Sequence, residues 1–336
     1  MRSLTRDRLI NLSFLFGTVI GFFVVGEVSL RVTGVEKGHP GPPQIFRTSA
    51  DPRISYELRP NVHERAYRRI VTTNSLGFRS PEIDPQKRTI AVLGDSISFG
   101  YGVADDQTLS AKLSGLLAHQ YNVLNAGVPG YTLSQEVSAY DTKIRSLDPA
   151  ALIIVFYWND LHDMDPGVVD DEGNLRPAGW QREPRRCNPI ETGILGLVPG
   201  RCWLDLHSAF YRTVKKLVSA RTERSNLRAQ QKEFKEHPEQ ESVRPENIDR
   251  YARTLSAFAS ALPASMPKLF VIWPDKELHA PTRPKLRSIA GKAGFTVIDL
   301  YDTFGNEVET LSWDTVHPSV TTIEKAAVVI KHELDL

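Results

Sequence analysis

The sequence has no excess of charge of either sign. Its 336 residues include 41 Lys and Arg against 40 Asp and Glu, a formal net charge of +1, and it has no long tail of one sign. Proteins that bind nucleic acid usually carry a basic excess, and we therefore expect no nucleic-acid partner. No internal repeat is visible either. The length suits one α/β domain of about 200–250 residues with additional segments.

Several common catalytic motifs are also missing. The chain has no Gly-x-Ser-x-Gly turn, which removes support for the standard α/β-hydrolase fold. It has no phosphate loop and no dinucleotide fingerprint. His162, Asp163 and Asp165 are close in sequence, but no second ligand pair has the spacing of a metal site. They are more simply interpreted as polar residues of an exposed loop, and we expect neither a metal nor a cofactor.

Cysteine is scarce, because Cys187 and Cys202 are the only two in the chain. Exported proteins pair their cysteines, whereas thiols stay reduced in the cytosol. We expect a disulfide between these two residues if the chain is exported. The alternative is two unrelated thiols.

Charge is absent from residues 9–26. This apolar run is long enough to span a bilayer, and the arginines before it favour a cytoplasmic N-terminus. We expect a single-pass anchor in the inner (cytoplasmic) membrane, with the rest of the chain on the periplasmic or extracytoplasmic side. The alternative is a signal peptide that is cleaved to give a secreted protein, although Val24-Val25-Gly26 is a poor cleavage site. A buried core helix fits less well, because every face of the run is apolar.

Strand and helix patterns alternate from residue 88 onward. The run 151–157 is apolar throughout, which is typical of a central parallel strand. This alternation predicts an α/β fold with a mostly parallel sheet and helices on both of its faces. The expected strands are 88–94, 121–125, 151–157, 268–273 and 295–299. The expected helices are 107–120, 133–147, 206–236, 247–262, 282–293 and 319–334.

The chain is expected to have three parts. Residues 1–33 are the anchor or signal segment. Residues 34–87 are a linker, rich in proline and glycine at first, and an N-terminal extension that packs on the domain, with a strand and a turn in 66–80. Residues 88–336 are the main domain, in which an insertion at about 163–250 interrupts the alternation.

The insertion begins directly after an expected strand end, where loops often carry specificity. We therefore expect it to govern substrate choice rather than chemistry. Trp158, Trp180 and Trp203 lie at or within it. We expect them to pack the insertion itself, and stacking on a sugar ring is the alternative.

Small polar residues follow three of the expected strands. Ser96 comes after the first, Asn125-Ala126-Gly127 after the second, and Asn159-Asp160 after the third. Ligands of parallel sheets bind at the carboxyl ends of the strands. The three segments are therefore predicted to meet at one edge.

A histidine and an aspartate complete a possible hydrolytic site. His317 precedes the last expected helix, and Asp314 stands three residues before it. A serine hydroxyl needs an adjacent base to become a nucleophile, and that base needs an orienting acid. Ser96, His317 and Asp314 can fill these roles. The Ser96 N–H, the Gly127 N–H and the Asn159 amide are the candidate donors to an oxyanion.

The order and spacing of these elements resemble the SGNH hydrolases, also called the GDSL esterase/lipase family. The four blocks of that family correspond here to Ser96, Gly127, Asn159 and His317, and the resemblance covers roughly 88–162 and 268–334. It implies a three-layer α/β/α sandwich, a Ser-His-Asp triad, a three-donor oxyanion hole and no metal. The stretches Asn74-Ser75-Leu76-Gly77-Phe78-Arg79 and Glu27-Val28-Ser29-Leu30-Arg31 are similar to a membrane-anchored bacterial branch.

The sequence departs from the family pattern at three places. Ile97 replaces the usual leucine after the Gly-Asp-Ser triplet. Tyr157 replaces the glycine of the third block, which predicts a narrower cleft beside Asn159. The glycine that often follows the His-Pro pair is missing. None of these changes removes a predicted catalytic group.

The resulting expectation is a serine esterase that acts on ester bonds outside the cytosol. Its substrate partner is an ester on an envelope or exported polysaccharide, with a lipid ester left open, and residues 9–26 contact the lipid bilayer. Deacylation by water makes the protein an esterase, whereas deacylation by a sugar hydroxyl makes it an acyltransferase. The rival interpretation is a non-catalytic glycan-binding or assembly protein of the cell envelope that uses the same cleft.

Overall fold

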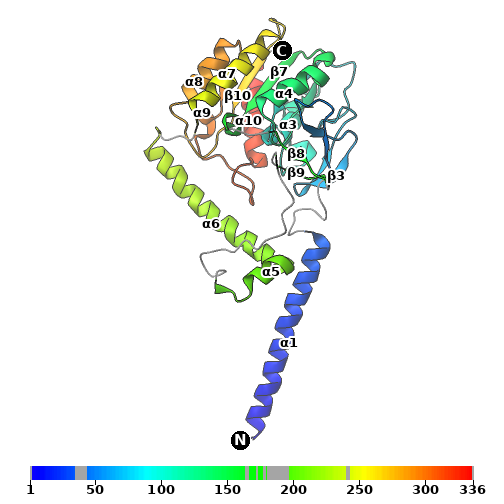
Figure 1. Ribbon diagram of the computed structural model, residues 1–336, viewed down its shortest axis with the longest axis vertical. Helices are drawn as coiled ribbons and strands as arrows, with labels where there is room; N and C mark the ends of the chain where they lie inside the picture. The colour runs from blue at the N-terminus through cyan, green and yellow to red at the C-terminus, as the bar shows by residue number, and fades with distance from the viewer. Residues whose placement is uncertain are drawn as a thin grey trace. The chain divides into compact units, whose positions relative to one another are not determined.

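The computed structural model describes residues 2–34, 44–162, 166–171, 173–176, 179, 197–239 and 243–334. The chain divides into two compact units. Unit 1 comprises residues 1–41 and 181–222, and unit 2 comprises residues 42–180 and 223–336. Figure 1 labels many of their helices and strands.

A five-stranded parallel sheet forms the centre of unit 2, in the spatial order β11-β10-β7-β5-β6. Its strands β7 and β10 are labelled in Figure 1. Every residue of β5 and β7 is buried, as expected for apolar strands that are covered on both faces. The strands are β5 (Thr89–Gly94), β6 (Asn122–Asn125), β7 (Ala151–Phe156), β10 (Lys268–Ile272) and β11 (Thr296–Asp299).

The strand order indicates where a ligand is expected to bind at the carboxyl ends of the strands, which we call the ligand edge of the sheet. β5 is the first of these strands along the chain, and it lies between the second and the third, β6 and β7. The order of the connections therefore reverses beside β5. In open α/β sheets, ligands bind outside the carboxyl ends of the strands at such a switch point.

Alternate residues of each strand face two separate cores, because successive side chains of a strand point to opposite sides. Leu93 and Ile154 pack with α4, α7 and α8, whereas Val92 and Ile153 pack with α3 and α10. The unit is thus a three-layer α/β/α sandwich, and the fold class expected from the sequence is confirmed. The helices are α3 (Leu109–Leu116), α4 (Leu133–Ala139), α7 (Pro245–Ser260), α8 (Arg283–Lys292) and α10 (Val320–Glu333).

Two antiparallel hairpins precede the sheet and pack on it. Tyr56 and Val71 share a core with Phe99 and Tyr131, which follow β5 and β6. The Tyr56 hydroxyl donates to the Pro129 carbonyl at 2.7 Å. The extension therefore supports the loops at the ligand edge. The paired strands are β1 (Phe46–Thr48) with β2 (Tyr56–Leu58), and β3 (His63–Ala66) with β4 (Arg69–Thr72).

Two helices differ from their expected form. The expected helix 133–147 is α-helical only to Ala139, and a π-helical turn (Tyr140–Ile144) and a 3₁₀ turn (Arg145–Leu147) follow. The expected helix 206–236 is two helices, α5 (Arg201–His207) and α6 (Ala209–Glu236). The break lies at Ser208, whose extended backbone lets its hydroxyl accept from the Tyr211 N–H at 3.1 Å as a helix cap.

Short elements complete the described part of the chain. They are α2 (Ser96–Phe99), α9 (Tyr301–Phe304), β8 (Val168–Val169), β9 (Leu175–Arg176) and two 3₁₀ turns, Asp105–Gln107 and Trp158–Leu161.

Unit 1 holds a long N-terminal helix, α1 (Arg2–Thr33), drawn in dark blue in Figure 1. The Glu27 carboxylate accepts from the Ser208 hydroxyl and from the Ala209 and Phe210 amides at 2.8–2.9 Å. These amides open α6 and have no partner within that helix. The Phe210 ring also contacts Phe23, with 5.1 Å between ring centroids. α1 is therefore joined to the start of α6.

Part of α1 has the length and composition of a membrane span. Residues Arg6–Thr33 contain an 18-residue window with a mean hydropathy of 2.1, and none of that window is buried. The helix is thus a candidate membrane span or signal anchor, in agreement with the apolar run found in the sequence.

Candidate active site

The turn after β5 presents Ser96 at the start of α2. Gly94 has φ +149°, and a Cβ built on it would lie 2.2 Å from the Ser98 hydroxyl oxygen, so this position requires glycine. The Asp95 carboxylate accepts from the Ile97 N–H at 2.9 Å and caps α2. The chain therefore turns sharply, and Ser96 begins the helix that follows β5.

A chain of hydrogen bonds joins Ser96, His317 and Asp314. His317 Nε2 lies 2.9 Å from the Ser96 Oγ, and His317 Nδ1 lies 2.8 Å from the Asp314 Oδ2. The other oxygen, Oδ1, accepts from the Val316 and His317 amides at 2.7 and 2.8 Å. Asp314 thus orients both the imidazole ring and the loop that carries it.

The environment of Asp314 favours its charged form. Burial acts to raise the pKa of this carboxyl, but the hydrogen bond and charge of His317 and the amides of His317 and Val316 outweigh it. The net effect is a pKa below the ordinary value for aspartate. A carboxylate in this state can stabilise a positively charged imidazole.

A tyrosine that the sequence did not single out covers the face of His317. The rings of Tyr101 and His317 are stacked at 3.9 Å between centroids, with 16° between their planes. Tyr67, from the N-terminal extension, lies against the same tyrosine at 4.2 Å. The stack restricts rotation of the imidazole. Its partners lie far apart in sequence, and no local pattern signals the contact.

Gly127 lies against α2, but its N–H is already bonded. A Cβ on this residue would lie 2.3 Å from the Phe99 nitrogen, so only glycine fits here. The Gly127 N–H donates to the Asn125 Oδ1 at 3.1 Å. It can reach an oxyanion only if this bond is shared or broken. The Ser96 N–H is the first amide of α2 and has no partner within that helix, although it also interacts with the Asp95 carboxylate.

Asn159 lies beside the same turn, through its contact with Asp95. Its Nδ2 donates to the Asp95 Oδ2 at 2.7 Å, and the second hydrogen of that amide group remains available for another acceptor. The preceding residue, Trp158, is buried and stacks on His279 at 3.5 Å. This stack covers one face of the Trp158 ring and fixes the segment that carries Asn159.

Asp95, which accepts from the Asn159 amide, is one of three buried carboxyl groups that interact with one another. Burial raises the pKa values of Asp95, Glu136 and Asp160. The charge of Asp95 raises the pKa of Glu136 further, and the charges of Glu136 and Asp95 do the same for Asp160. Neither Glu136 oxygen has a hydrogen-bond partner in the described part of the chain. Glu136 and Asp160 therefore favour their neutral forms, which avoids the cost of a buried unpaired charge.

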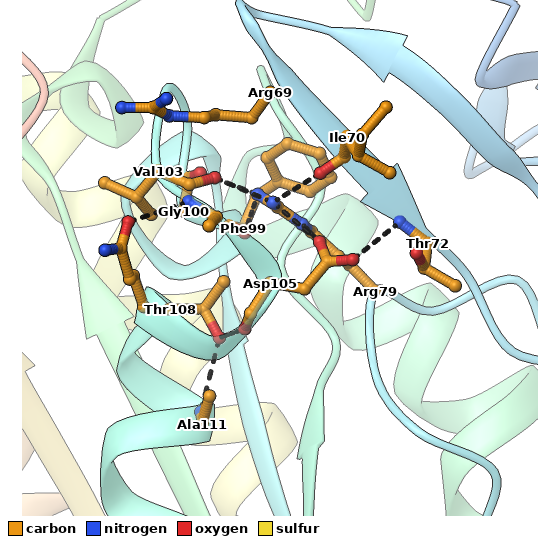
Figure 2. A network of polar contacts seen from close by, with 12 residues as sticks. Arg69, Ile70, Thr72, Arg79, Phe99, Gly100, Val103, Asp105, Thr108 and Ala111 are labelled. Carbon is orange, nitrogen blue, oxygen red and sulfur yellow. Dashed lines mark hydrogen bonds and ion pairs between the residues drawn. The ribbon is translucent and has the colours of Figure 1, made fainter.

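Arg79 of the N-terminal extension holds the segment after α2 (Figure 2). Its side chain is buried and donates to the carbonyl oxygens of Gly100 and Val103 at 2.7 and 2.8 Å, and to Asp105 at 2.8 Å. Burial lowers the pKa of this guanidinium, and Asp105 counteracts the shift. The Asp105 carboxylate also accepts from the Thr72 N–H at 3.1 Å. The extension is thereby bonded directly to the chain that leaves Ser96.

Some predicted residues lie outside the part of the chain that the structure describes. Asp163, Asp165, Trp180 and Cys187 are among them. The disulfide between Cys187 and Cys202 therefore stays a prediction, although Cys202 is not a free cysteine. Within the described residues, no group of three or more His, Cys, Asp and Glu could hold a metal ion.

The model of the GDSL-like Lipase/Acylhydrolase family matches residues 92–322, more than half of the chain. No curated protein gives a match.

Similar solved structures have low sequence identity to this chain. A lipolytic protein of the G-D-S-L family from Desulfitobacterium hafniense DCB-2 is 14% identical, with a TM-score of 0.41, over 74% of this chain and 100% of that one. A lipase/acylhydrolase from Enterococcus faecalis is 14% identical, with a TM-score of 0.40, over 73% and 94%. A catalytic mutant of an acetylxylan esterase from Geobacillus stearothermophilus is 15% identical, with a TM-score of 0.40, over 74% and 94%.

Proposed function

Because the chain belongs to the GDSL-like lipase/acylhydrolase family and is a hydrolase that acts on ester bonds, we propose that Ser96 is its nucleophile. His317 is the general base, and Asp314 orients it. The observation that carries this proposal is the hydrogen-bonded chain from Ser96 through His317 to Asp314, which joins residues 221 positions apart. Groups at such distances provide both proton transfer and orientation without rearrangement.

The proposed reaction follows from this geometry. Ser96 Oγ attacks the ester carbonyl while His317 Nε2 takes its proton, and the same nitrogen later protonates the leaving alcohol. The Ser96 N–H and the Asn159 amide donate to the oxyanion, and the Gly127 N–H joins them if it leaves Asn125. Water, or a sugar hydroxyl in a transferase, then attacks the acyl-enzyme and releases Ser96.

The proposed substrates are O-acyl groups of envelope or exported polysaccharide, outside the cytosol. The apolar helix Arg6–Thr33 supports this location. The bonds from Glu27 to Ser208 and to the first amides of α6 favour an anchor that is retained over a signal that is cleaved, because cleavage after Gly26 would leave Glu27 at a free N-terminus without the helix that positions it. The three parts proposed for the chain remain 1–33, 34–87, and 88–336 with an insertion at about 163–250.

The location can be tested separately from the chemistry. A reporter that is active only outside the cytosol, fused after Leu336, should be active. The mature protein should keep its N-terminal residues and stay in the membrane fraction after a salt wash. A soluble product that begins near Glu27 would support cleavage and contradict the anchor.

An ester panel tests the function. Full-length protein in detergent should hydrolyse 4-nitrophenyl acetate and acetylated oligosaccharides, and Ser96→Ala should lower kcat by several orders of magnitude, as loss of a triad nucleophile does. The variant should keep the thermal stability of the parent protein. Undiminished hydrolysis by Ser96→Ala would contradict the assignment. If the wild-type protein binds glycans but hydrolyses no ester, the rival function of a non-catalytic envelope protein is favoured.

A further inference from the structure

A cleft of about 600 Å³ opens beside the candidate catalytic residues within unit 2. Its wall includes Asn159, one of the candidate oxyanion donors, and Thr315 and Val316, which lie between Asp314 and His317. The volume is within the range of sites that bind small molecules. A substrate whose ester lies at Ser96 can therefore extend into this space.

One wall of the cleft is a single face of α6. The lining residues Glu223, Asn226, Leu227, Gln230 and Gln231 recur at intervals of three and four, the spacing of one helix face. This face comes from the insertion and not from the sheet.

Contacts with the loop before His317 fix this part of α6. The Gln231 side chain donates to the Asn306 carbonyl at 2.7 Å, and the Asn306 amide donates back to the Gln231 carbonyl at 3.2 Å. The Arg224 guanidinium donates to the Leu311 carbonyl at 2.6 Å. The helix is therefore bonded to the segment that leads to the catalytic histidine.

Two amide side chains on this face are available for a ligand. Asn226 and Gln230 are exposed residues one turn apart, and neither side chain has a hydrogen-bond partner among the residues that the structure describes. We call these two residues the amide pair. Each amide has donors and an acceptor, and a sugar hydroxyl likewise donates and accepts. An acyl chain in the same place would leave these groups buried and unpaired, at a cost of about 1–3 kcal/mol each.

The charges in the cleft disfavour an anionic ligand. Glu223, Asp275 and Glu277 line it, against Lys276 as the one lysine or arginine in the lining. A phosphate or a uronate would meet a net negative wall, and like charges close together destabilise a complex. A neutral sugar meets no such penalty.

We propose that the amide pair of α6 binds the hydroxyl groups of a neutral sugar that carries the scissile ester. The inference rests on the proposed esterase function and names the part of the substrate that the insertion recognises. The acyl group lies at Ser96, the sugar lies between α6 and the loop 306–316, and the amide pair determines the preference for sugar esters.

The test compares two substrates in three proteins, each full-length in detergent. The substrates are partially acetylated neutral oligosaccharides and 4-nitrophenyl acetate, which has no sugar. The proteins are the wild type, Asn226→Ala/Gln230→Ala, and the control Ser225→Ala/Glu233→Ala, which changes two exposed α6 residues outside the cleft lining. Thermal melting checks that all three fold alike.

The quantity to compare is the kcat/KM for the oligosaccharide divided by that for 4-nitrophenyl acetate. It should fall at least about tenfold in the amide-pair variant, a loss of about 1.4 kcal/mol of discrimination, and stay within about twofold in the control. An unchanged quotient in the amide-pair variant would overturn the inference. So would a wild-type enzyme that hydrolyses 4-nitrophenyl acetate but no acetylated oligosaccharide. Loss of all ester hydrolysis from the wild type would instead overturn the proposed function.

Discussion

Replacement of Asp314 by asparagine isolates one feature of the candidate triad. The two side chains have nearly the same shape, so Oδ1 can still accept from the Val316 and His317 amides. The change falls on the other atom, Oδ2, which accepts from His317 Nδ1 at 2.8 Å. In asparagine this position is an amide nitrogen, which donates a hydrogen bond. The His317 Nδ1 must then accept that bond, and it can do so only without its proton.

The exchange of an acceptor for a donor moves the imidazole proton to Nε2, the nitrogen that lies 2.9 Å from the Ser96 Oγ. Nε2 then donates to the serine and cannot take its proton. The expected loss in kcat is about 10⁴-fold, or about 5 kcal/mol in the barrier. Hydrolysis of 4-nitrophenyl acetate measures the loss, and circular dichroism on heating checks the fold.

A matched control is Asp106→Asn, which makes the same change at an exposed aspartate. It should keep wild-type activity. If Asp314→Asn is folded and keeps more than about a tenth of wild-type kcat, Asp314 does not set the tautomer of His317, and this assignment of roles is wrong.

Three further predictions follow from other contacts. Arg79→Met should lower the free energy of unfolding in urea by about 2–5 kcal/mol, because it leaves the buried carbonyl oxygens of Gly100 and Val103 without their donor, at about 1–3 kcal/mol each. The exposed Arg65→Met is the control, and equal effects of the two would contradict this account. Glu136→Gln should gain stability relative to the wild type as the pH rises above about 4.5. The pKa of buried Glu136 is raised in the folded state, so the wild-type protein loses up to about 1.4 kcal/mol of its free energy of unfolding per pH unit until that pKa is passed. Parallel curves of unfolding free energy against pH for the two proteins would refute the raised pKa. Thiol labelling of the unreduced, denatured protein should find no free cysteine, since a bridge between Cys187 and Cys202 closes a loop of about 15 residues and contributes about 3 kcal/mol; labelling of both residues would exclude the bridge.

The sequence predicted the fold and the meeting of the polar segments because both follow from local patterns. Apolar runs of five or six residues that alternate with helical patterns predict parallel strands, and Ser96 and Asn159 come two and three residues after the ends of β5 and β7. The carboxyl ends of parallel strands share an edge, so their proximity needed no knowledge of side-chain packing. His317 could be placed by the same reasoning, because it lies between the last strand and the last helix.

Contacts between distant segments left no such signal. The stack of Tyr101 on His317 and the bonds of Arg79 to the chain after α2 depend on how separate loops meet. Gly127 lies against α2, and the competing bond from its N–H to Asn125 is a detail of side-chain conformation. The end of α4 and the break at Ser208 likewise depend on local backbone geometry that hydrophobic periodicity does not specify.

The central claim is that Ser96 is a nucleophile activated by His317. Its most direct test is labelling of the full-length protein with a fluorophosphonate, followed by mass spectrometry of the peptides. We predict one adduct, on Ser96, that is absent from Ser96→Ala and forms far more slowly in His317→Ala. An adduct on another residue, or ester hydrolysis by a protein whose Ser96 never labels, would contradict the account.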